Sequence, residues 1–238
     1  MEHHGNNPRK NIIAIIPARY QSARLPGKLL LPLSGKPLIL HTAGQARKAV
    51  NIDRVIVATD DQRIYDVARE NGFEAVKTSP DHQSGSDRIA EVAEKMPEHS
   101  IIVNVQGDEP LISPSTIEKA VDSLIRDETV NVATTCEAIC DIKDVLSPDV
   151  VKVTIDKSGF ALYRKHTGLY VYRREFLLKY TKQKQTNLEK TELLEQLRVL
   201  ENGERIKVVE VSESSIGVDT REDFERVRRI LEKAGERF

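Results

Sequence analysis

The chain has 238 residues, with 36 basic and 37 acidic side chains and a formal net charge of -1. This length allows one large domain, or two small ones, with a substantial buried core. The balanced charge provides no overall field that would attract nucleic acid or an anionic membrane. The absence of Trp and the aromatic content of 5% argue against a stacking surface for single-stranded nucleic acid.

Targeting and redox signals are weak in this sequence. No apolar run reaches the ~18 residues that suggest a membrane span, and the first residues lack the apolar core of a signal peptide. We expect a cytoplasmic protein with a flexible tail over residues 1–11 and a single domain over residues 12–238. Cys136 and Cys140 have no second pair to complete a metal site, so both are expected to be packing residues or reduced thiols.

A buried strand followed by a cationic loop opens the domain. The apolar run Ile12–Ile16 predicts a central strand of a parallel sheet, and Pro17 is expected to end it. The next loop carries Arg19, Arg24 and Lys28 among small or turn-forming residues. In open α/β sheets, anions bind at the carboxyl ends of such strands. The alternative is a basic loop that is merely solvated.

Strand-like and helix-like segments then alternate, which predicts an α/β fold with a mostly parallel, doubly wound sheet. Further strands are expected at residues 54–59, 73–78 and 100–106. Helices are expected up to residue 49, over 62–71 with Gly72 as the C′ residue, up to 96, and from Ser113-Pro114 onward. Ser86 or Asp87 is expected to cap the helix that ends near 96.

The second half of the chain is less regular. Strands are expected at residues 130–137, 150–156, 159–163, 168–172 and 206–211, with a hairpin turn at 157–159. Thr186 and Glu189 form the capping box of a helix that would place Leu193, Leu197 and Leu200 on one face and end at residues 202–203. A final helix is expected from Thr220 to Lys233.

Carboxylates follow several of the predicted strands. Asp60 and Asp108 each end a core strand, and Asp219 follows a short apolar segment, so all three should lie beside the cationic loop. Asp108 and Asp219 could hold Mg²⁺, whose remaining ligands are usually phosphate oxygens and water. Asp219 and Asp60 could instead cap helices.

The sequence around Gly27 and Lys28 lacks the spacing of a P-loop or of a dinucleotide-binding fingerprint. Cationic side chains would therefore bind the phosphates, as backbone amides do in those loops. Such an arrangement suits a triphosphate that is attacked at its α-phosphorus. At the turn Ser84-Gly85-Ser86, a backbone carbonyl together with a donor such as Arg88 could select cytosine. The alternative is an ordinary Gly-Ser turn. His166, Glu195 and Gln196 are weak candidates by themselves, because such residues are commonly surface or satisfied core.

Six motifs, taken together and in order, resemble those of the 3-deoxy-manno-octulosonate (KDO) cytidylyltransferase family. They read IIPARYQSARLPGK, IVATDD, DHQSGSDR, NVQGDEP, LEQLRVLENG and GVDTREDFERV, and they extend from Ile12 to about Ile230. The resemblance implies a Rossmann-like nucleotidyltransferase sheet with a sugar-binding and dimerisation subregion near residues 130–203. It also implies a homodimer, CTP and a keto-sugar acid as substrates, Mg²⁺ as cofactor, and a role in lipopolysaccharide biosynthesis.

The resemblance also implies roles for particular residues. Those similar to the family's nucleotide-binding residues are Arg19, Ser22, Arg24, Lys28, Ser84, Gly85 and Arg88. Those similar to the metal ligands are Asp108 and Asp219, and those similar to the sugar-binding residues are Gln106, His166, Glu195 and Gln196. Lys28, Arg19 and Asp108 are the expected catalytic residues, acting by positioning and charge stabilisation without a covalent nucleophile.

One segment departs from the family. The family continues after Ala161-Leu162-Tyr163 with Phe-Ser-Arg and a flap of a few tens of residues, whereas here Tyr163 runs directly into Arg164. Either the protein lacks the flap, or a flexible segment is absent from the sequence as given. Three alternative functions stay open: a sialic-acid-type cytidylyltransferase or one for another keto-sugar acid, a uridylyl or guanylyl homologue, and a non-catalytic nucleotide-binding module.

Overall fold

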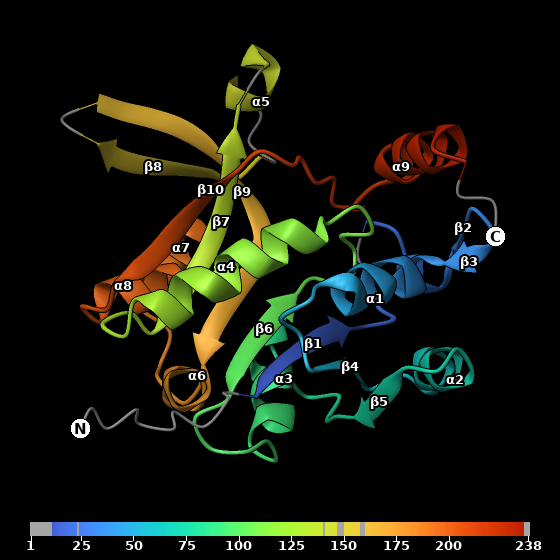
Figure 1. Cartoon of the computed structure of the whole chain (residues 1–238), viewed down its shortest axis with the longest axis horizontal. Coiled ribbons are helices and arrows are strands. Elements are labelled where there is room, and N and C mark those ends of the chain that lie inside the picture. The colour runs from blue at the N-terminus through green and yellow to red at the C-terminus, as the bar shows by residue number, and fades with distance from the viewer. Residues whose placement is uncertain (1–10, 23, 140, 147–149, 158–159, 236–238) are drawn as a thin grey trace, which may run out of the picture.

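The computed structural model describes residues 11–22, 24–139, 141–146, 150–157 and 160–235. Residues 1–10 of the predicted tail (residues 1–11), Cys140 and the turn residues Ser158-Gly159 lie outside this description. The described core is a sheet with the strand order β10-β7-β9-β6-β1-β4-β5, and β8 pairs with β9 outside this path (Figure 1). The strands are β1 (Ile12–Ala18), β4 (Arg54–Thr59), β5 (Glu74–Lys77), β6 (Ile101–Val105), β7 (Val132–Ala138), β8 (Lys152–Lys157), β9 (Phe160–Arg173) and β10 (Ile206–Val211).

The direction of the strands confirms a mostly parallel sheet. β6, β1, β4 and β5 are parallel neighbours, and β7 is parallel to β10. β9 lies between these two groups and is antiparallel to both β6 and β7. β6 and β7 therefore run in the same direction, so the carboxyl ends of the parallel strands of both groups lie at one edge of the sheet.

β1 is the central strand that the apolar run predicted, but Pro17 does not end it. β1 pairs with β6 only up to Ile15 and with β4 up to Ala18. Pro17 therefore lies in the part of the strand that has a single hydrogen-bonded neighbour, where a missing N–H is tolerated.

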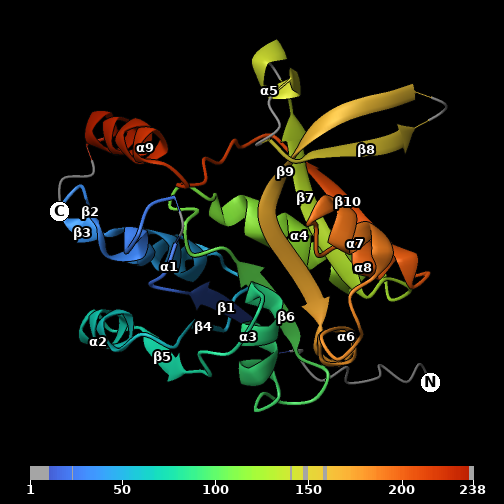
Figure 2. The same ribbon diagram turned by 180° about the vertical axis from the view of Figure 1, so that it is seen from behind.

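Helices cover both faces of the sheet. The front face in Figure 1 carries α1 (Leu38–Lys48), α2 (Gln62–Glu70), α4 (Pro114–Arg126) and α9 (Arg221–Lys233). Figure 2 shows α3 (Gly85–Ala93), α6 (Arg174–Tyr180), α7 (Asn187–Glu192) and α8 (Leu197–Glu201) from the other side. Alternate β1 residues supply the two cores: Ile12, Ala14 and Ile16 face the first, while Ile13 and Ile15 face the second. None of the helices in the described part of the chain is long and apolar enough to cross a membrane.

The observed helix caps remove the capping explanation for two aspartates. Asp61 caps α2 and Thr220 caps α9, so neither Asp60 nor Asp219 serves as a cap. The expectation that Ser86 or Asp87 caps α3 was wrong, because Ser84 accepts the N–H of Asp87 and closes a capping box with it. With Ser84 as the cap, the first turn of α3 begins at Gly85, and the side chain of Ser84 satisfies one of the N–H groups that the helix itself leaves without a partner.

The single helix expected after Thr186 is two short helices. α7 ends at Leu193, which adopts a left-handed conformation (φ 55°) and is 86% exposed. The prediction that Leu193, Leu197 and Leu200 lie on one face of a single helix was therefore wrong. Glu189 accepts the N–H of Thr186, which supplies one half of the expected capping box.

The remaining elements are small, except for the hairpin of β8 and β9. The small ones are η1 (Lys28–Leu30), β2 (Pro32–Leu33), β3 (Lys36–Pro37) and α5 (Ile142–Leu146). β8 pairs with the first half of β9, from Lys157 opposite Phe160 to Lys152 opposite Lys165. β9 then continues to Arg173, so the two strands predicted at 159–163 and 168–172 are one strand.

Candidate active site

Three side chains from distant parts of the chain meet at the carboxyl end of the sheet. Lys28 Nζ lies 2.6 Å from Asp108 Oδ2 and 2.9 Å from Asp219 Oδ1. Lys28 begins η1, Asp108 follows β6, and Asp219 directly precedes the cap of α9. The predicted convergence of the cationic loop with both aspartates is therefore present in the structure.

The main chain holds the two aspartate segments together. Val218 N–H donates to the carbonyl of Asp108 at 2.8 Å. Thr42 of α1 donates to the carbonyl of Gly107 at 2.9 Å. A Cβ at Gly107 would lie 3.0 Å from the carbonyl oxygen of Pro17, so glycine allows the turn to approach β1 closely.

The electrostatics of this cluster favour a cation between the carboxylates. Lys28 is 8% exposed, and burial alone would lower the pKa of its ammonium. The charges and hydrogen bonds of Asp108 and Asp219 outweigh burial and raise the pKa of Lys28 above its ordinary 10.5. Lys28 is consequently charged at neutral pH.

The same donor set fits a hard divalent cation. Mg²⁺ is usually bound by one or two carboxylates, while substrate phosphate oxygens and water complete its octahedron. Within the described residues no group of three or more His, Cys, Asp or Glu side chains could hold a metal ion alone. The assignment of Asp108 and Asp219 as Mg²⁺ ligands stays a prediction.

Glu109 is a site residue that the sequence analysis missed. It accepts a hydrogen bond from Ser215, in the segment that leads to Asp219. A Cβ at Gly168 or at Gly217 would lie 3.1 Å from Glu109 Oε1, so the carboxyl group is enclosed by two glycines. Burial raises the pKa of Glu109 to about 7 despite the hydrogen bond from Ser215. In the sequence, the only indication of a role for Glu109 was its position next to Asp108 in the motif NVQGDEP.

The cationic loop reaches two different parts of the site. Arg24 Nη2 lies 2.9 Å from Asp219 Oδ2, beside Lys28. Arg19 donates to the carbonyl of His82 at 2.5 Å and so lies against the turn predicted to read the base. Ser22 is half-buried in the same loop.

The base-reading turn lies next to the predicted sugar residues. Gly85 begins α3 after the Ser84 cap, and a Cβ there would lie 3.5 Å from Pro17 Cγ and 4.0 Å from Gln106 Nε2. Arg88 is 1% exposed, and its guanidinium binds Asp60 at 3.0 Å and the Thr78 hydroxyl. The structure places Arg88 as a buried support of the turn, and its contact with a base stays a prediction. Asp60 therefore has a different cationic partner from Asp108 and Asp219, which both pair with Lys28.

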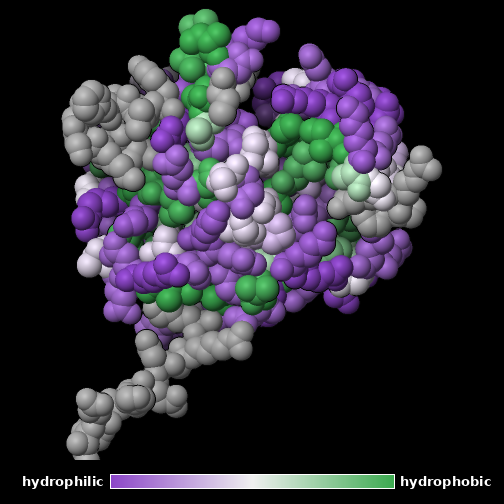
Figure 3. All heavy atoms as spheres, turned by 45° about the horizontal axis from the view of Figure 1, so that its top comes forward, coloured by the Kyte–Doolittle hydropathy of each residue, from purple (hydrophilic) through white to green (hydrophobic). Residues whose placement is uncertain are grey.

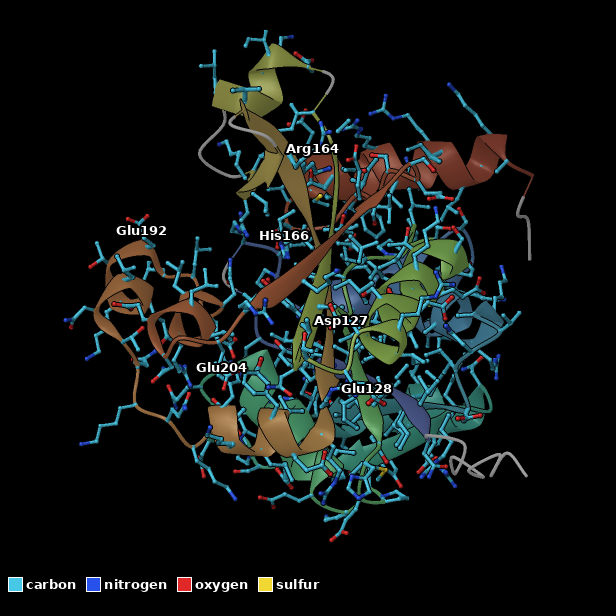
Figure 4. All side chains as sticks on the ribbon, turned by 60° about the vertical axis from the view of Figure 1, so that its left-hand side comes forward. Asp127, Glu128, Arg164, His166, Glu192 and Glu204 are labelled. Carbon is cyan, nitrogen blue, oxygen red and sulfur yellow. The ribbon has the colours of Figure 1, made fainter. Side chains whose placement is uncertain are left out.

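The four predicted sugar residues come from three elements around β9. Gln106 packs against Gly168, whose Cβ would be 3.2 Å from Gln106 Cγ. His166 lies on β9 beside β7, where Thr134 Oγ1 is 2.8 Å from its Nε2 (Figure 4). Burial lowers the pKa of His166 to about 4, so the ring is neutral at neutral pH.

Glu195 and Gln196 lie in the turn between α7 and α8. Glu195 Oε1 accepts a hydrogen bond from the Tyr180 hydroxyl at 3.1 Å. Burial raises the pKa of Glu195, although hydrogen bonds from Ser86 and Tyr180 oppose the increase. The bond from Ser86 connects Glu195 to the base-reading turn, and Gln196 is the residue before α8.

A wound sheet with two aspartates and a cationic loop at one edge defines a nucleotidyltransferase, and the sequence matches the cytidylyltransferase family over residues 13–167. A relative in Trichlorobacter lovleyi is 45% identical over 250 residues, covering 93% of this chain and 99% of the relative. One in Geotalea daltonii is 46% identical over 252 residues, covering 94% and 99%. Both are named 3-deoxy-manno-octulosonate cytidylyltransferase, and this chain belongs to that family.

A solved structure supports the same assignment. It is described as CMP:2-keto-3-deoxy-manno-octonic acid synthetase complexed with CTP. The two structures have a TM-score of 0.88 and 36% sequence identity, over 94% of this chain and 100% of the other.

Proposed function

We propose that this protein transfers CMP from CTP to the anomeric hydroxyl of KDO, with release of pyrophosphate, for lipopolysaccharide biosynthesis. The observation that carries the proposal is the meeting of Lys28, Asp108 and Asp219 at one edge of the sheet, in a member of this enzyme family. Cationic side chains stabilise the negative charge of a triphosphate. A carboxylate or a metal ion near the attacking hydroxyl helps to remove its proton.

The chain would act mainly by positioning. Lys28 and Arg24 hold the departing pyrophosphate, and Arg19 contacts the phosphates near the reacting α-phosphorus. Neutral His166 orients the sugar acid together with Gln106, Glu195 and Gln196. Ser84 and Gly85 let the backbone approach the base. The sugar hydroxyl then attacks in line, opposite the pyrophosphate.

Asp108 and Asp219 are the residues that would hold Mg²⁺. The ion would supply charge neutralisation at the α-phosphate and a lower pKa for the sugar hydroxyl. The main-chain bond between Val218 and Asp108 keeps these carboxylates aligned before any ligand arrives.

A second candidate is transfer to another keto-sugar acid, such as amino-KDO or sialic acid. The alignment with the Trichlorobacter lovleyi relative spans 250 residues but 93% of this chain, or about 221 residues, so about 29 positions have no counterpart here. Together with the unbroken β9, this favours a sugar site that differs from those of the relatives.

The test measures pyrophosphate release from each nucleoside triphosphate with KDO, amino-KDO and sialic acid, with and without Mg²⁺. We expect CTP and KDO to be the preferred pair and Mg²⁺ to be required. Preference for another sugar acid would select the second candidate. CTP binding by calorimetry without pyrophosphate release from any acid would indicate a binding module.

Asp108→Asn tests the metal assignment. We expect turnover to fall below detection, because the amide binds Mg²⁺ more weakly than the carboxylate, while the circular dichroism spectrum stays unchanged. The control is Asp66→Asn on the exposed side of α2. Pyrophosphate release by Asp108→Asn at the wild-type rate would remove Asp108 from the metal site.

We also propose a cytoplasmic homodimer. The support for a dimer is the exposed apolar surface of α5, where Ile142 is 66% and Leu146 is 76% exposed. Figure 3 shows an apolar patch at the top of the molecule, where α5 lies.

A further inference from the structure

A groove crosses α1 on the front face of the molecule, and none of its lining residues is among those proposed to bind CTP. It has a volume of about 260 Å³. Its lining includes the largely buried side chains of Leu40 and Phe73, called its floor here, which are 5% and 6% exposed. The other lining residues come mainly from β3, from α1 and from the connection between α2 and β5. Figure 1 shows α1 between α4 and α2 on this face.

The charges along the groove have one sign. Lys36, Arg47 and Lys48 line it together with His41, and none of the described residues that line it is acidic. The Arg47 guanidinium lies 3.9 Å from the centroid of the Phe73 ring, which fixes its position beside the floor. In a protein with a net charge of -1, a concave surface lined by three cationic residues has a local excess of positive charge.

Gly44 provides an independent observation. It lies inside α1, where glycine costs about 1 kcal/mol relative to alanine. Packing does not require it, since a Cβ at Gly44 would meet no atom within 4 Å. The missing side chain leaves the groove open across the helix, so a ligand can approach the main chain of α1.

We propose that this groove binds a small molecule that carries a phosphate monoester, at a position distinct from the CTP site. The cations select a phosphate oxyanion, and the apolar floor accommodates a short carbon skeleton. The volume is slightly below the ~300 Å³ at which ordinary ligand pockets begin, which favours a molecule smaller than a nucleotide.

The groove has a physical connection to the metal turn. Pro110 lines it and lies two residues after Asp108. His41 also lines the groove, and the hydroxyl of the next residue, Thr42, donates a hydrogen bond to the carbonyl of Gly107. A ligand in the groove therefore contacts a helix that is bonded directly to the turn of the candidate active site.

The test uses glycerol 3-phosphate as the probe and the backbone amide signals of ¹⁵N-labelled full-length protein as the readout. We expect saturable shifts of the Gly44 and Gln45 amides, and no such shifts with uncharged glycerol. The Gly27 amide reports separately on binding at the cationic loop. Because turnover is not measured, the result is independent of the proposed cytidylyl transfer.

Two variants and a control decide the outcome. Lys48→Gln should weaken binding about five-fold, which is the contribution of one charge at ~4 Å in water. Gly44→Leu should abolish the shift of Gln45 by filling the groove, and it should fold because leucine favours helix more than glycine does. Lys95→Gln, exposed beyond α3, should bind as wild type. No saturable shift in wild type, or equal shifts in all three variants, would overturn the proposal.

Discussion

Lys28 has one set of partners in the ligand-free chain and another in the proposed reaction. In the ligand-free chain its ammonium joins Asp108 and Asp219, and Arg24 binds the second oxygen of Asp219. In the proposed reaction the same cations bind phosphate. Asp108 and Asp219, which would hold Mg²⁺, would then be released from these cations, so nucleotide and metal should assist each other's binding.

Lys28→Met tests this exchange of partners. Without the ammonium, the two carboxylates repel each other, so Mn²⁺ should bind the nucleotide-free variant about ten-fold more tightly than wild type, or about 1.4 kcal/mol. CTP should bind more weakly. Calorimetry on each ligand alone measures both effects, with Lys95→Gln as the control. Weaker Mn²⁺ binding by Lys28→Met would contradict the exchange.

His166 makes stability depend on pH. Its pKa is lowered by burial to about 4 in the folded chain, from an ordinary value of 6.5. Between these values the unfolded chain binds more protons, so stability falls as the pH falls from 6.5 toward 4. From pH 7 to pH 5, wild type should lose about 1 to 2 kcal/mol more than His166→Gln, because the side chain keeps some solvent contact.

Urea unfolding at the two pH values measures this difference. His99→Gln is a suitable control, since its side chain is on the surface. An equal loss of stability in wild type and in His166→Gln would show that His166 is not the responsible group.

The turn between α7 and α8 depends on a buried ion pair. Arg198 Nε lies 2.8 Å from Glu189 Oε2, and Arg198 Nη2 lies 2.5 Å from Glu189 Oε1. Their side chains are 7% and 4% exposed. The pair lowers the pKa of Glu189 and holds the segment that contains Glu195 and Gln196.

Glu189→Ala should destabilise the fold by about 3 kcal/mol, because it leaves the Arg198 charge buried without its partner. Glu192→Ala, at the outer end of α7 in Figure 4, should change stability by less than about 0.5 kcal/mol. Chemical denaturation measures both variants. A similar, small effect for the two would mean that the ion pair is not needed to hold the turn.

Local patterns predicted the regular elements well. The apolar runs of β1, β4 and β6 and the start of α4 at Ser113-Pro114 are confirmed. The interruption at Leu193 was not predictable, because a leucine spacing of three to four residues looks helical whether or not the backbone continues. The unbroken β9 was missed for a related reason: its pairing with β7 and β8 decides its length.

In the candidate site, too, local patterns predicted which elements end near one another but not which residues pair over long distances in the sequence. The end of β6 correctly placed Asp108 at the carboxyl edge of the sheet, where the ends of parallel strands meet. Asp219 follows a loop after β10, and the bond from Val218 N–H to the carbonyl of Asp108 brings that loop to the same edge. The bond between Ser215 and Glu109, and that between Arg88 and Asp60, join residues far apart in sequence. No local pattern specifies such partners, and the groove beside Gly44 likewise depends on the packing of α1 against neighbouring segments.

At the scale of the molecule, the exposed apolar face of α5 predicts the mode of assembly. Sedimentation velocity should give about twice the chain mass of 26.8 kDa. Ile142→Asp with Leu146→Asp should shift the protein to monomer, because two buried charges at an apolar contact are costly. Val50→Asp is the control, since Val50 is 84% exposed in the turn after α1. A variant that remains dimeric would place the interface elsewhere.

β9 is the one strand in the described sheet that is hydrogen-bonded to both β6 and β7. During synthesis on the ribosome, β6 emerges well before β9 and has an unpaired, apolar edge until β9 is complete. Such an edge is a template for pairing with another chain. A nascent chain that stalls before Arg173 should therefore aggregate or engage chaperones, and slow translation through that stretch is a hazard for producing the protein.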